Sequence, residues 1–355
     1  MRNAEITGWG MSVPPAILTN EDLETICDTN DEWIVTRTGI KERRISHVKT
    51  SEMAVVAARR AMACAGLGPE DIDLLIVATC TPDTLIPAAA AFVQAELGLT
   101  KAGAYDLNAA CSGWVYALTQ GNAMIKAGAA ETVLIVGVER LSRCLDFADR
   151  TTCVLFGDGA GATVLQATDG DHGVLSGTLG IDGTTAEYLW IPDSGTNEHH
   201  LDKSDDSQAV RMDGPEVFKR AVRMMGDSSL KVVADAGLEL EDVDLLIPHQ
   251  ANKRIIDATA RRLKLDEDKV FIDIHKYGNT SAATIPIAMT EALAQGFIKP
   301  GSTIVFTAFG GGLTWAAAVV KWGQRTTPLG TSDAELAPSD LTALELLEPN
   351  LRGIL

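Results

Sequence analysis

An internal repeat constrains the fold of this chain more than any other feature of its sequence. The segment AGLGPEDIDLLI at 65–76 returns as AGLELEDVDLLI at 236–247, a shift of 171 residues. At the same shift Asn108 falls on Asn279, and each copy then continues through a stretch rich in small residues into an apolar run. Separate matches in one register indicate that the chain consists of two similar lobes.

Each lobe is predicted to be a mixed α/β unit. In both copies D-[IV]-D-L-L-I has the short, continuous apolar run of a strand buried on both faces, and a helix-like segment precedes it. Strands that alternate with helices in this way are typical of α/β folds. We place the first lobe at 1–170 and the second at 171–322.

The last segment, 323–355, lies outside the repeat. It is acidic and interrupted by proline and glycine, and we treat it as an extension. Its stretch SDLTALELLEP predicts a short helix with Ser339 or Asp340 as the N-cap and Pro349 near its end. The apolar face of this helix is expected to dock on the body or on a partner subunit, or else the segment is loose.

Composition and charge exclude several classes of protein. At 355 residues and 46% hydrophobic, the chain has enough apolar side chains for a large core, whereas a net charge of −18 disfavours binding to nucleic acid or to an anionic membrane. No apolar run reaches the roughly 18 residues of a membrane span or resembles a signal peptide. The cysteines are scattered without a C-x-x-C pair, so we predict a cytoplasmic protein with no metal site.

Cys111 stands between a strand-like run and a helix-like run, in AYDLNAACSGWVYAL at 104–118. The N-terminus of a helix carries unpaired N–H groups and a partial positive charge, which stabilise a thiolate. We therefore expect a cysteine at this place to have a lowered pKa and to act as a nucleophile. The alternative is a cysteine that only fills space in the core, which is the commoner role of this residue.

Three further features come from the second lobe. His249 follows the end of a buried strand, where ligands bind in α/β folds, unless it is an ordinary loop histidine. Asn279 opens the helix that corresponds to the helix after Cys111. FGGGLTW at 309–315 either forms a tight turn or directs N–H groups at an oxyanion. Cysteine, histidine and asparagine together favour covalent acyl chemistry, in which the asparagine stabilises an enolate or thioester oxygen.

The chain resembles the β-ketoacyl-acyl carrier protein synthase III enzymes of the thiolase superfamily. The resemblance covers residues 1 to 322 and rests on specific motifs: TNDEWIVTRTGIKERR, DLNAACSGWVYAL, LFGDGAGA, PHQANKRI, YGNTSAATIP and AFGGGLTW. It implies a two-lobed, five-layered αβαβα fold and a homodimer. It also implies that the protein starts fatty-acid synthesis by condensing an acyl-CoA starter with malonyl-acyl carrier protein, without a cofactor.

The same resemblance assigns roles to residues. Cys111 is implied to be the acylated nucleophile, His249 and Asn279 the pair that drives decarboxylation, and the N–H groups of Cys111 and Gly311 the oxyanion hole. The other implied residues contact substrate or partner: Trp33, Arg37 and Arg150 for the CoA nucleotide, Gly214 and Asn252 for the pantetheine arm, Lys253 and Arg254 for docking of the carrier protein, and Ile86 for the end of the acyl pocket.

Two departures from the family pattern leave the starter open. Ile86 stands where other members have phenylalanine or threonine, and its intermediate size does not decide between an acetyl, a short branched and a medium-length chain. The acidic extension is not part of the usual pattern. The alternatives are a same-fold condensing enzyme of secondary metabolism, a thioesterase-like hydrolase and a non-catalytic scaffold. The His249–Asn279 pair argues against the hydrolase, and the intact Cys-His-Asn set against the scaffold.

Overall fold

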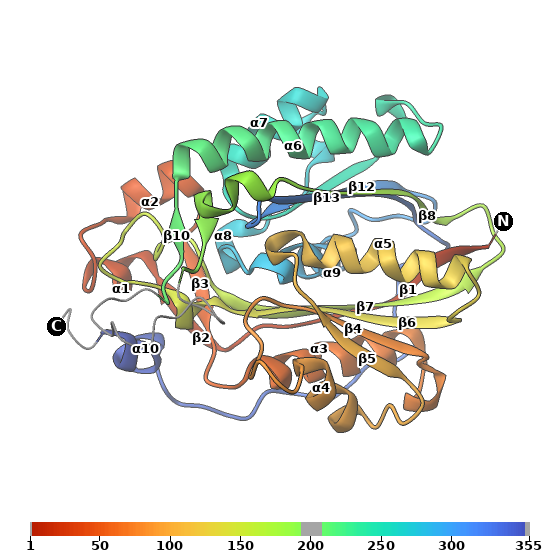
Figure 1. Ribbon diagram of the computed structural model, residues 1–355, viewed down its shortest axis with the longest axis horizontal. Coiled ribbons are helices and arrows are strands. Elements are labelled where there is room, and N and C mark those ends of the chain that lie inside the picture. Colours follow the sequence, from red (N-terminus) through yellow and green to blue (C-terminus); the bar gives the residue numbers. More distant parts are fainter. Residues whose placement is uncertain (1, 193–207, 352–355) are drawn as a thin grey trace.

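The computed structural model describes residues 2–192 and 208–351 of the chain. Five layers are stacked in the order helix, sheet, helix, sheet, helix (Figure 1). This arrangement confirms the αβαβα architecture expected from the sequence. Within the described residues, no helix is long and apolar enough to span a membrane.

The first sheet has the strand order β1-β7-β6-β4-β5. Its strands are β1 (Asn3–Ser12), β4 (Leu74–Ala78), β5 (Gly103–Leu107), β6 (Thr132–Arg140) and β7 (Asp158–Thr168). β4 runs parallel to β5 and β6, whereas β7 is antiparallel to β6 and β1. The inner strand β4 is buried along its whole length, because helices cover both faces of the sheet.

The second sheet has the strand order β11-β12-β13-β8. Its strands are β8 (Gly173–Ile181), β11 (Leu245–Pro248), β12 (Thr303–Gly310) and β13 (Thr314–Lys321). β11 is parallel to β12, and β13 is antiparallel to β12 and β8. The strands of the first sheet all precede residue 171, and those of the second lie between 171 and 322.

Two helices, α5 (Gly113–Lys126) and α9 (Thr284–Ala294), form the layer between the sheets (Figure 1). α9 is buried on nearly all sides, which its apolar sequence permits. α5 contacts strands of both sheets. One apolar core therefore extends from the first sheet through this layer to the second.

The outer layers and the connections complete the fold. α3 (Thr50–Ala65) and α4 (Ala89–Leu97) cover the first sheet, and α6 (Gly214–Asp235) and α7 (Lys253–Leu263) cover the second (Figure 1). The shorter helices and strands are α1 (Asn20–Glu24), α2 (Asp31–Thr38), α8 (Ile274–Tyr277), β2 (Ala16–Thr19), β3 (Glu42–Ile45), β9 (Leu189–Trp190) and β10 (Arg211–Met212). β2 pairs with β3, and β9 with β10.

The two lobes repeat each other in detail. Single turns of 3-10 helix occupy Pro69–Asp71 and Leu240–Asp242, the same positions in the two copies of the repeat. The turns that lead into α5 and α9 each contain a non-glycine residue with positive φ, Ala110 at 46° and Ser281 at 50°. Because such a φ is uncommon for residues other than glycine, its occurrence at both sites confirms the internal repeat.

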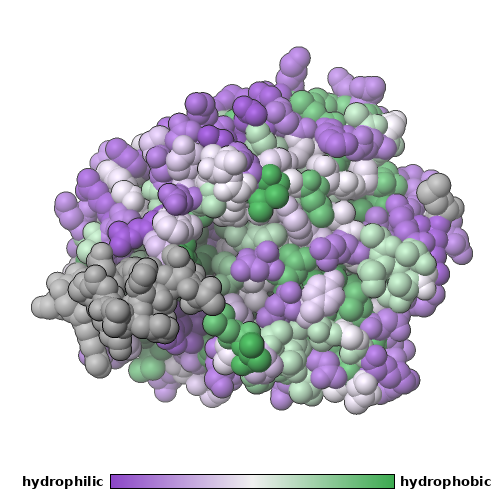
Figure 2. Space-filling view, viewed as in Figure 1, coloured by the Kyte–Doolittle hydropathy of each residue, from purple (hydrophilic) through white to green (hydrophobic). Residues whose placement is uncertain are grey.

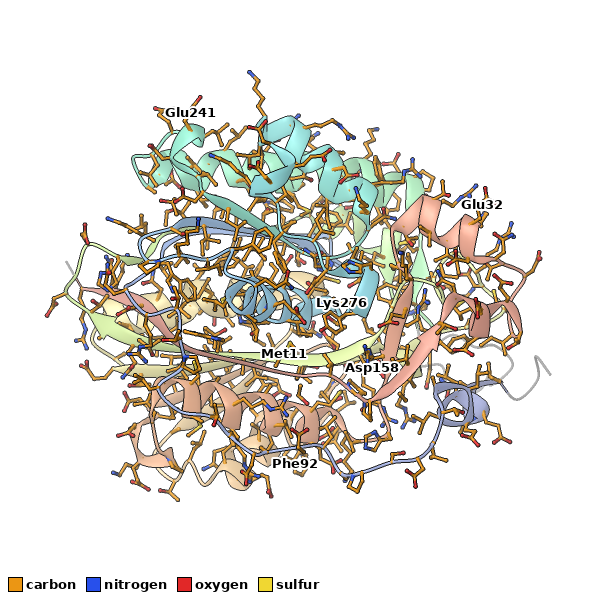
Figure 3. All side chains as sticks on the ribbon, turned by 180° about the vertical axis from the view of Figure 1, so that it is seen from behind. Met11, Glu32, Phe92, Asp158, Glu241 and Lys276 are labelled. Carbon is orange, nitrogen blue, oxygen red and sulfur yellow. The ribbon has the colours of Figure 1, made fainter. Side chains whose placement is uncertain are left out.

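The extension crosses the outer face of the first lobe, as seen from behind in Figure 3. Arg60 of α3 forms an ion pair with Glu335, and the Leu329 N–H donates to a carbonyl at the end of α3. The final helix, α10 (Ala343–Leu351), contacts β2 and β3 and buries one apolar face in the core there, with Leu347 at its centre. The extension therefore docks on the body of its own chain.

The N-cap of α10 differs from the prediction. Thr342 occupies this place: its hydroxyl accepts the N–H of Glu345, whose carboxylate accepts the N–H and hydroxyl of Thr342. This reciprocal arrangement satisfies donors at both positions, which Ser339 or Asp340 would not do. The expected caps were therefore wrong by two or three positions, although the helix itself was predicted.

We predict that α10 contributes to the stability of the whole chain. Leu347→Ala should lower the free energy of unfolding by about 2–4 kcal/mol, because the leucine is buried and its loss leaves a cavity. Glu348→Ala is the matched control, since Glu348 is exposed on the same helix. Urea unfolding followed by circular dichroism measures both. Equal stability of the two variants would show that the extension does not support the fold.

Candidate active site

Cys111 lies in the tight turn between β5 and α5, against the second lobe. The turn runs over Ala110–Ser112 and buries the cysteine, which is 8% exposed. Gly310, the last residue of β12, packs directly on it: a Cβ at position 310 would lie 2.6 Å from the Cys111 backbone nitrogen. Only glycine permits this approach, which brings the glycine run of lobe two to Cys111 of lobe one.

The two N–H groups expected to form an oxyanion hole are close together. The backbone N–H groups of Cys111 and Gly311 both act on the Cys111 sulfur and lower its pKa. An oxygen bonded to the carbon that Cys111 attacks would meet the same two donors. Donors fixed in this way stabilise the charge of a tetrahedral intermediate.

Burial determines the protonation of Cys111. It raises the pKa of the thiol to about 11, although the Ser281 hydroxyl and the two N–H groups act in the opposite direction. The lowered pKa expected from the start of a helix is therefore wrong for the unliganded site. The helix α5 begins only at Gly113, and the desolvation of Cys111 outweighs the partial charge there.

His249 follows β11 and is also buried. Its backbone N–H donates to Thr307, and its Nδ1 lies 2.6 Å from the Thr284 hydroxyl at the start of α9. Burial lowers the pKa of His249 to about 3, so the imidazole is neutral at physiological pH. A neutral imidazole acts through one N–H, and the Thr284 contact decides which nitrogen carries it.

Asn279 is held by both lobes. Its backbone pairs with the segment around Phe156 of the first lobe: its N–H donates to Leu155, and its carbonyl accepts the N–H of Gly157. Its Oδ1 accepts the backbone N–H of Ser281 at 2.8 Å. Because a backbone N–H only donates, the amide orientation is fixed, and the two Nδ2 hydrogens remain for another acceptor.

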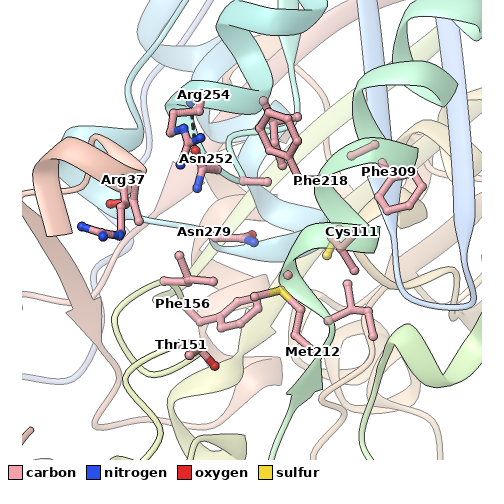
Figure 4. Close-up of a pocket in the computed structure, with 18 of the residues that line it drawn as sticks. Arg37, Cys111, Thr151, Phe156, Met212, Phe218, Asn252, Arg254, Asn279 and Phe309 are labelled. Carbon is pink, nitrogen blue, oxygen red and sulfur yellow. Dashed lines mark hydrogen bonds between the residues drawn. The ribbon is translucent and has the colours of Figure 1, made fainter. Parts of the chain in front are cut away.

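Cys111, His249 and Asn279 meet in one cavity of about 550 Å³. Figure 4 shows the amide of Asn279 directed toward the side of the cavity that carries Cys111. Most of the lining is apolar, and it includes residues from both lobes: Thr38, Val154, Leu155, Phe156, Leu189, Met212, Val217, Phe218, Ala221, Met225, Ile255 and Phe309. A largely apolar cavity with a few convergent polar groups is the usual form of a small-molecule site.

A second cavity, of about 420 Å³, meets the first at Cys111. Both cavities share Cys111, Phe156 and Leu189, and the second also includes Gly311. Its lining is again mainly apolar, from Leu141, Ile181, Trp190, Ile191 and Val210. A substrate that reaches Cys111 through the first cavity therefore finds room for an apolar chain beyond the sulfur.

Two arginines stack on one tryptophan at the other end of the first cavity. The guanidinium of Arg37 lies 4.5 Å from the ring centroid of Trp33, and that of Arg150 lies 5.1 Å from it. Arg150 also donates to the Asp28 carbonyl at 2.9 Å. Trp33 and Arg37 line the cavity, whereas Arg150 is not part of the lining and stacks on the Trp33 ring. Stacked guanidinium and indole planes suit a purine and its phosphates.

The other predicted binding residues lie along the same cavity or at its rim. Gly214, the first residue of α6, lines it, as does Asn252, the N-cap of α7. Arg254 also lines it and lies over the Phe218 ring at 5.6 Å (Figure 4). Lys253 is partly exposed and pairs with Asp257 on α7.

Ile86 is not part of either cavity in the single chain. It is 89% exposed, in the segment before α4, and the cavities that contain Cys111 do not include it. Within the single chain the second cavity is lined by other residues, such as Leu141 and Ile191.

Comparisons with known proteins agree with this geometry. Family models described as 3-oxoacyl-[acyl-carrier-protein (ACP)] synthase III and as its C terminal match residues 105–183 and 233–322. The β-ketoacyl-[acyl-carrier-protein] synthase III 2 of Vibrio cholerae is 52% identical over 344 residues, which cover 97% of this chain and 95% of the relative. The chain belongs to the β-ketoacyl-acyl carrier protein synthase III family.

Further relatives support this assignment. The synthase III of Symbiobacterium thermophilum is 50% identical over 331 residues, covering 91% of this chain and 99% of the relative. The crystal structure of 3-oxoacyl-[acyl-carrier-protein] synthase III from Aquifex aeolicus has a TM-score of 0.85 at 46% identity and covers 90% of this chain and 100% of that one. A priming β-ketosynthase of the R1128 polyketide pathway has a TM-score of 0.84 at 35% identity, covering 90% and 96%. The protein is an acyltransferase, and the identities favour fatty-acid over polyketide synthesis.

Sequence reasoning missed several residues of the site. Thr284 and Ser281 are in YGNTSAATIP, a motif noted only for Asn279, and they contact His249 and Asn279 respectively. Phe156 and Leu189 line both cavities: Phe156 belongs to LFGDGAGA, a motif quoted without a role for this residue, and Leu189 comes from a segment without a recognisable pattern. The sequence offered one signal for Thr284: a hydroxyl residue at the start of the helix that corresponds to the helix after Cys111.

We predict that Cys111 reacts as a thiol with a raised pKa. Because the pKa is about 11, the thiolate fraction should rise about tenfold per pH unit between about pH 7 and pH 9. The rate of alkylation of Cys111 by iodoacetamide, followed by peptide mass spectrometry, should rise with it and show no plateau. The Cys111→Ser variant shows how much of the alkylation comes from the other cysteines. A plateau below pH 8 would mean that the pKa is lowered after all.

Proposed function

We propose that the protein condenses an acyl group from acyl-CoA with malonyl-acyl carrier protein, with loss of CO2, and so initiates fatty-acid synthesis. The observation that carries this proposal is the meeting of Cys111, His249 and Asn279 in one buried cavity, with two N–H groups beside the sulfur and Trp33 and Arg37 at the far end. The names of the relatives, which describe synthases of this type, support it.

In the first half-reaction the Cys111 sulfur attacks the thioester carbon of acyl-CoA. The carbonyl oxygen becomes negative and accepts hydrogen bonds from the N–H groups of Cys111 and Gly311. The C–S bond to CoA then breaks, and the thiol proton of Cys111 leaves with CoA as its thiol. The acyl chain occupies the second cavity, which extends beyond the sulfur.

In the second half-reaction malonyl-acyl carrier protein occupies the first cavity. As the C–C bond to the carboxylate breaks, CO2 leaves and the electron pair forms an enolate, whose oxygen accepts from Asn279 Nδ2 and His249 Nε2. Nε2 donates when Nδ1 accepts the one proton of the Thr284 hydroxyl across their 2.6 Å contact, so in this step that hydroxyl turns away from the Ser281 carbonyl, to which it otherwise donates at 3.0 Å. The enolate carbon attacks the acyl carbon, and Cys111 leaves as a thiolate that recovers a proton.

The carrier protein docks at the mouth of the first cavity. Arg254 and Lys253 stand at the start of α7, beside that mouth, and supply local positive charge on a chain whose net charge is −18. Such a patch suits an acidic carrier protein, because complementary charge steers association. The six cysteines are free of disulfides, which is consistent with a cytoplasmic protein.

The functional unit is a homodimer. β5 lies at the edge of the first sheet with its residues mostly exposed, Tyr105 among them. The neighbouring helix α4 and the segment before it expose further large apolar side chains: Phe92, Leu85 and Ile86. Figure 2 shows apolar surface on the face that carries β5 and α4. An unpaired edge with exposed apolar neighbours suits pairing with a second copy of the same strand. In such a dimer the exposed Ile86 lies against the partner chain.

The reaction is tested by separating its two halves. Wild-type protein incubated with a series of acyl-CoAs from acetyl to dodecanoyl should gain one acyl group by intact mass, whereas Cys111→Ser should gain none. His249→Ala should still be acylated but should decarboxylate malonyl-acyl carrier protein at least 100-fold more slowly, because it lacks one enolate donor. If no acyl-CoA labels the wild type, the proposal fails.

The dimer is tested at the exposed segment before α4. Leu85→Asp and Ile86→Asp should convert the dimer to a monomer, because a charge buried without a partner opposes association. Leu230→Asp, at an exposed leucine of α6, should leave the dimer intact. Size-exclusion chromatography with light scattering gives the masses. A monomeric wild type, or a dimer that survives both first variants, would contradict this interface.

A further inference from the structure

Glu139, near the end of β6, is a fully buried carboxylate beside the active site. It accepts hydrogen bonds from the hydroxyl of Thr81 at 2.5 Å, the backbone N–H of Cys80 at 3.1 Å and the hydroxyl of Ser281 at 3.1 Å. Among the described residues no basic side chain forms an ion pair with it. A buried charge without a counter-ion opposes folding, so we expect Glu139 to have a role other than stabilising the fold.

The contact with Ser281 crosses between the lobes and leads to Asn279. Ser281 is buried and has φ 50°, a conformation that serine adopts only under restraint. In this conformation its N–H points at Asn279 Oδ1, at 2.8 Å. The hydroxyl of this serine also donates to Glu139, at 3.1 Å. The turn that orients the Asn279 amide is therefore linked to a carboxylate of the other lobe.

The internal repeat provides a comparison within the same molecule. In the first lobe Ala110 has φ 46°, and its N–H donates to Asn108 Oδ1, so the same turn forms there. Yet Ala110 has no hydroxyl, and the repeat places Gly310 where the other copy has Glu139. The turn therefore forms without a carboxylate. A hydroxyl and a carboxylate meet only at the turn that carries Asn279, which lines the first cavity with His249 and Cys111, whereas Asn108 lines the second cavity.

We propose that Glu139 is a positioning residue for decarboxylation: through Ser281 it holds the Asn279 amide with Nδ2 directed at the enolate oxygen. This inference rests on the proposed function. Glu139 touches neither substrate in this role, and it binds the single hydroxyl proton of Ser281, which would lower the pKa of Cys111 if it were donated to the sulfur. Its negative charge acts against acylation, because it raises the pKa of Cys111. The two half-reactions should therefore respond to its removal in different directions.

Glu139→Gln tests this difference, because it removes the charge and keeps the size of the side chain. Acylation of Cys111 by acyl-CoA, measured by single-turnover mass spectrometry, should be unchanged or faster. Decarboxylation of malonyl-acyl carrier protein should fall about tenfold or more. Thr79→Val is the matched control: Thr79 also donates to Glu139, at 3.3 Å, but lies away from Asn279, and both rates should stay within about twofold of wild type.

The route through Asn279 is tested by a double-mutant cycle. In an Asn279→Ala background, Glu139→Gln should cause no further loss of decarboxylation, because its effect acts through the missing amide. An equal fall of both half-reactions in Glu139→Gln, or additive losses in the cycle, would overturn the proposal. If Glu139→Gln does not fold, Ser281→Ala replaces it in the cycle. It should likewise cause no further loss of decarboxylation in the Asn279→Ala background. A wild type that does not decarboxylate malonyl-acyl carrier protein would instead overturn the proposed function.

Discussion

The close contact of the two lobes at the starts of α5 and α9 is the constraint on which the rest of the structure depends. Cys111 comes from the first lobe, whereas His249, Asn279 and Gly311 come from the second. Neither half holds a complete set of catalytic groups. The approach of Gly310 to the Cys111 backbone, and the shared apolar core behind it, fix the two halves to within the tolerance that chemistry requires.

The depth of this contact also sets the electrostatics of the site. Burial raises the pKa of Cys111 to about 11 and lowers that of His249 to about 3, so both are neutral in the unliganded site. The same exclusion of water strengthens each N–H group that faces a developing negative charge. The unliganded site thus contains little thiolate, but its N–H groups are placed to stabilise the charges that appear on the thioester and enolate oxygens.

Much of this arrangement could be predicted from the sequence, and the exceptions have a common cause. The repeat predicted two lobes, the resemblance to the synthase III family implied five layers, and the position of His249 after a strand end suggested a site. Those inferences depend on motifs and local pattern. The sign of the Cys111 pKa shift and the role of Ser281 depend on how far one lobe buries the other, and the exposure of Ile86 depends on the path of the chain before α4; no local pattern contains either. The N-cap of α10 was missed for a simpler reason: three neighbouring residues can all act as caps.

The repeat has a consequence for the independence of the two lobes. A lobe taken alone would expose to water the faces of α5 or α9 that are now buried in the shared core, together with one surface of its sheet. Each lobe therefore depends on the other for its apolar cover. Because both copies stand in one chain, they need not be identical at the contact: the second carries Gly310 against the Cys111 backbone, where the first carries Glu139.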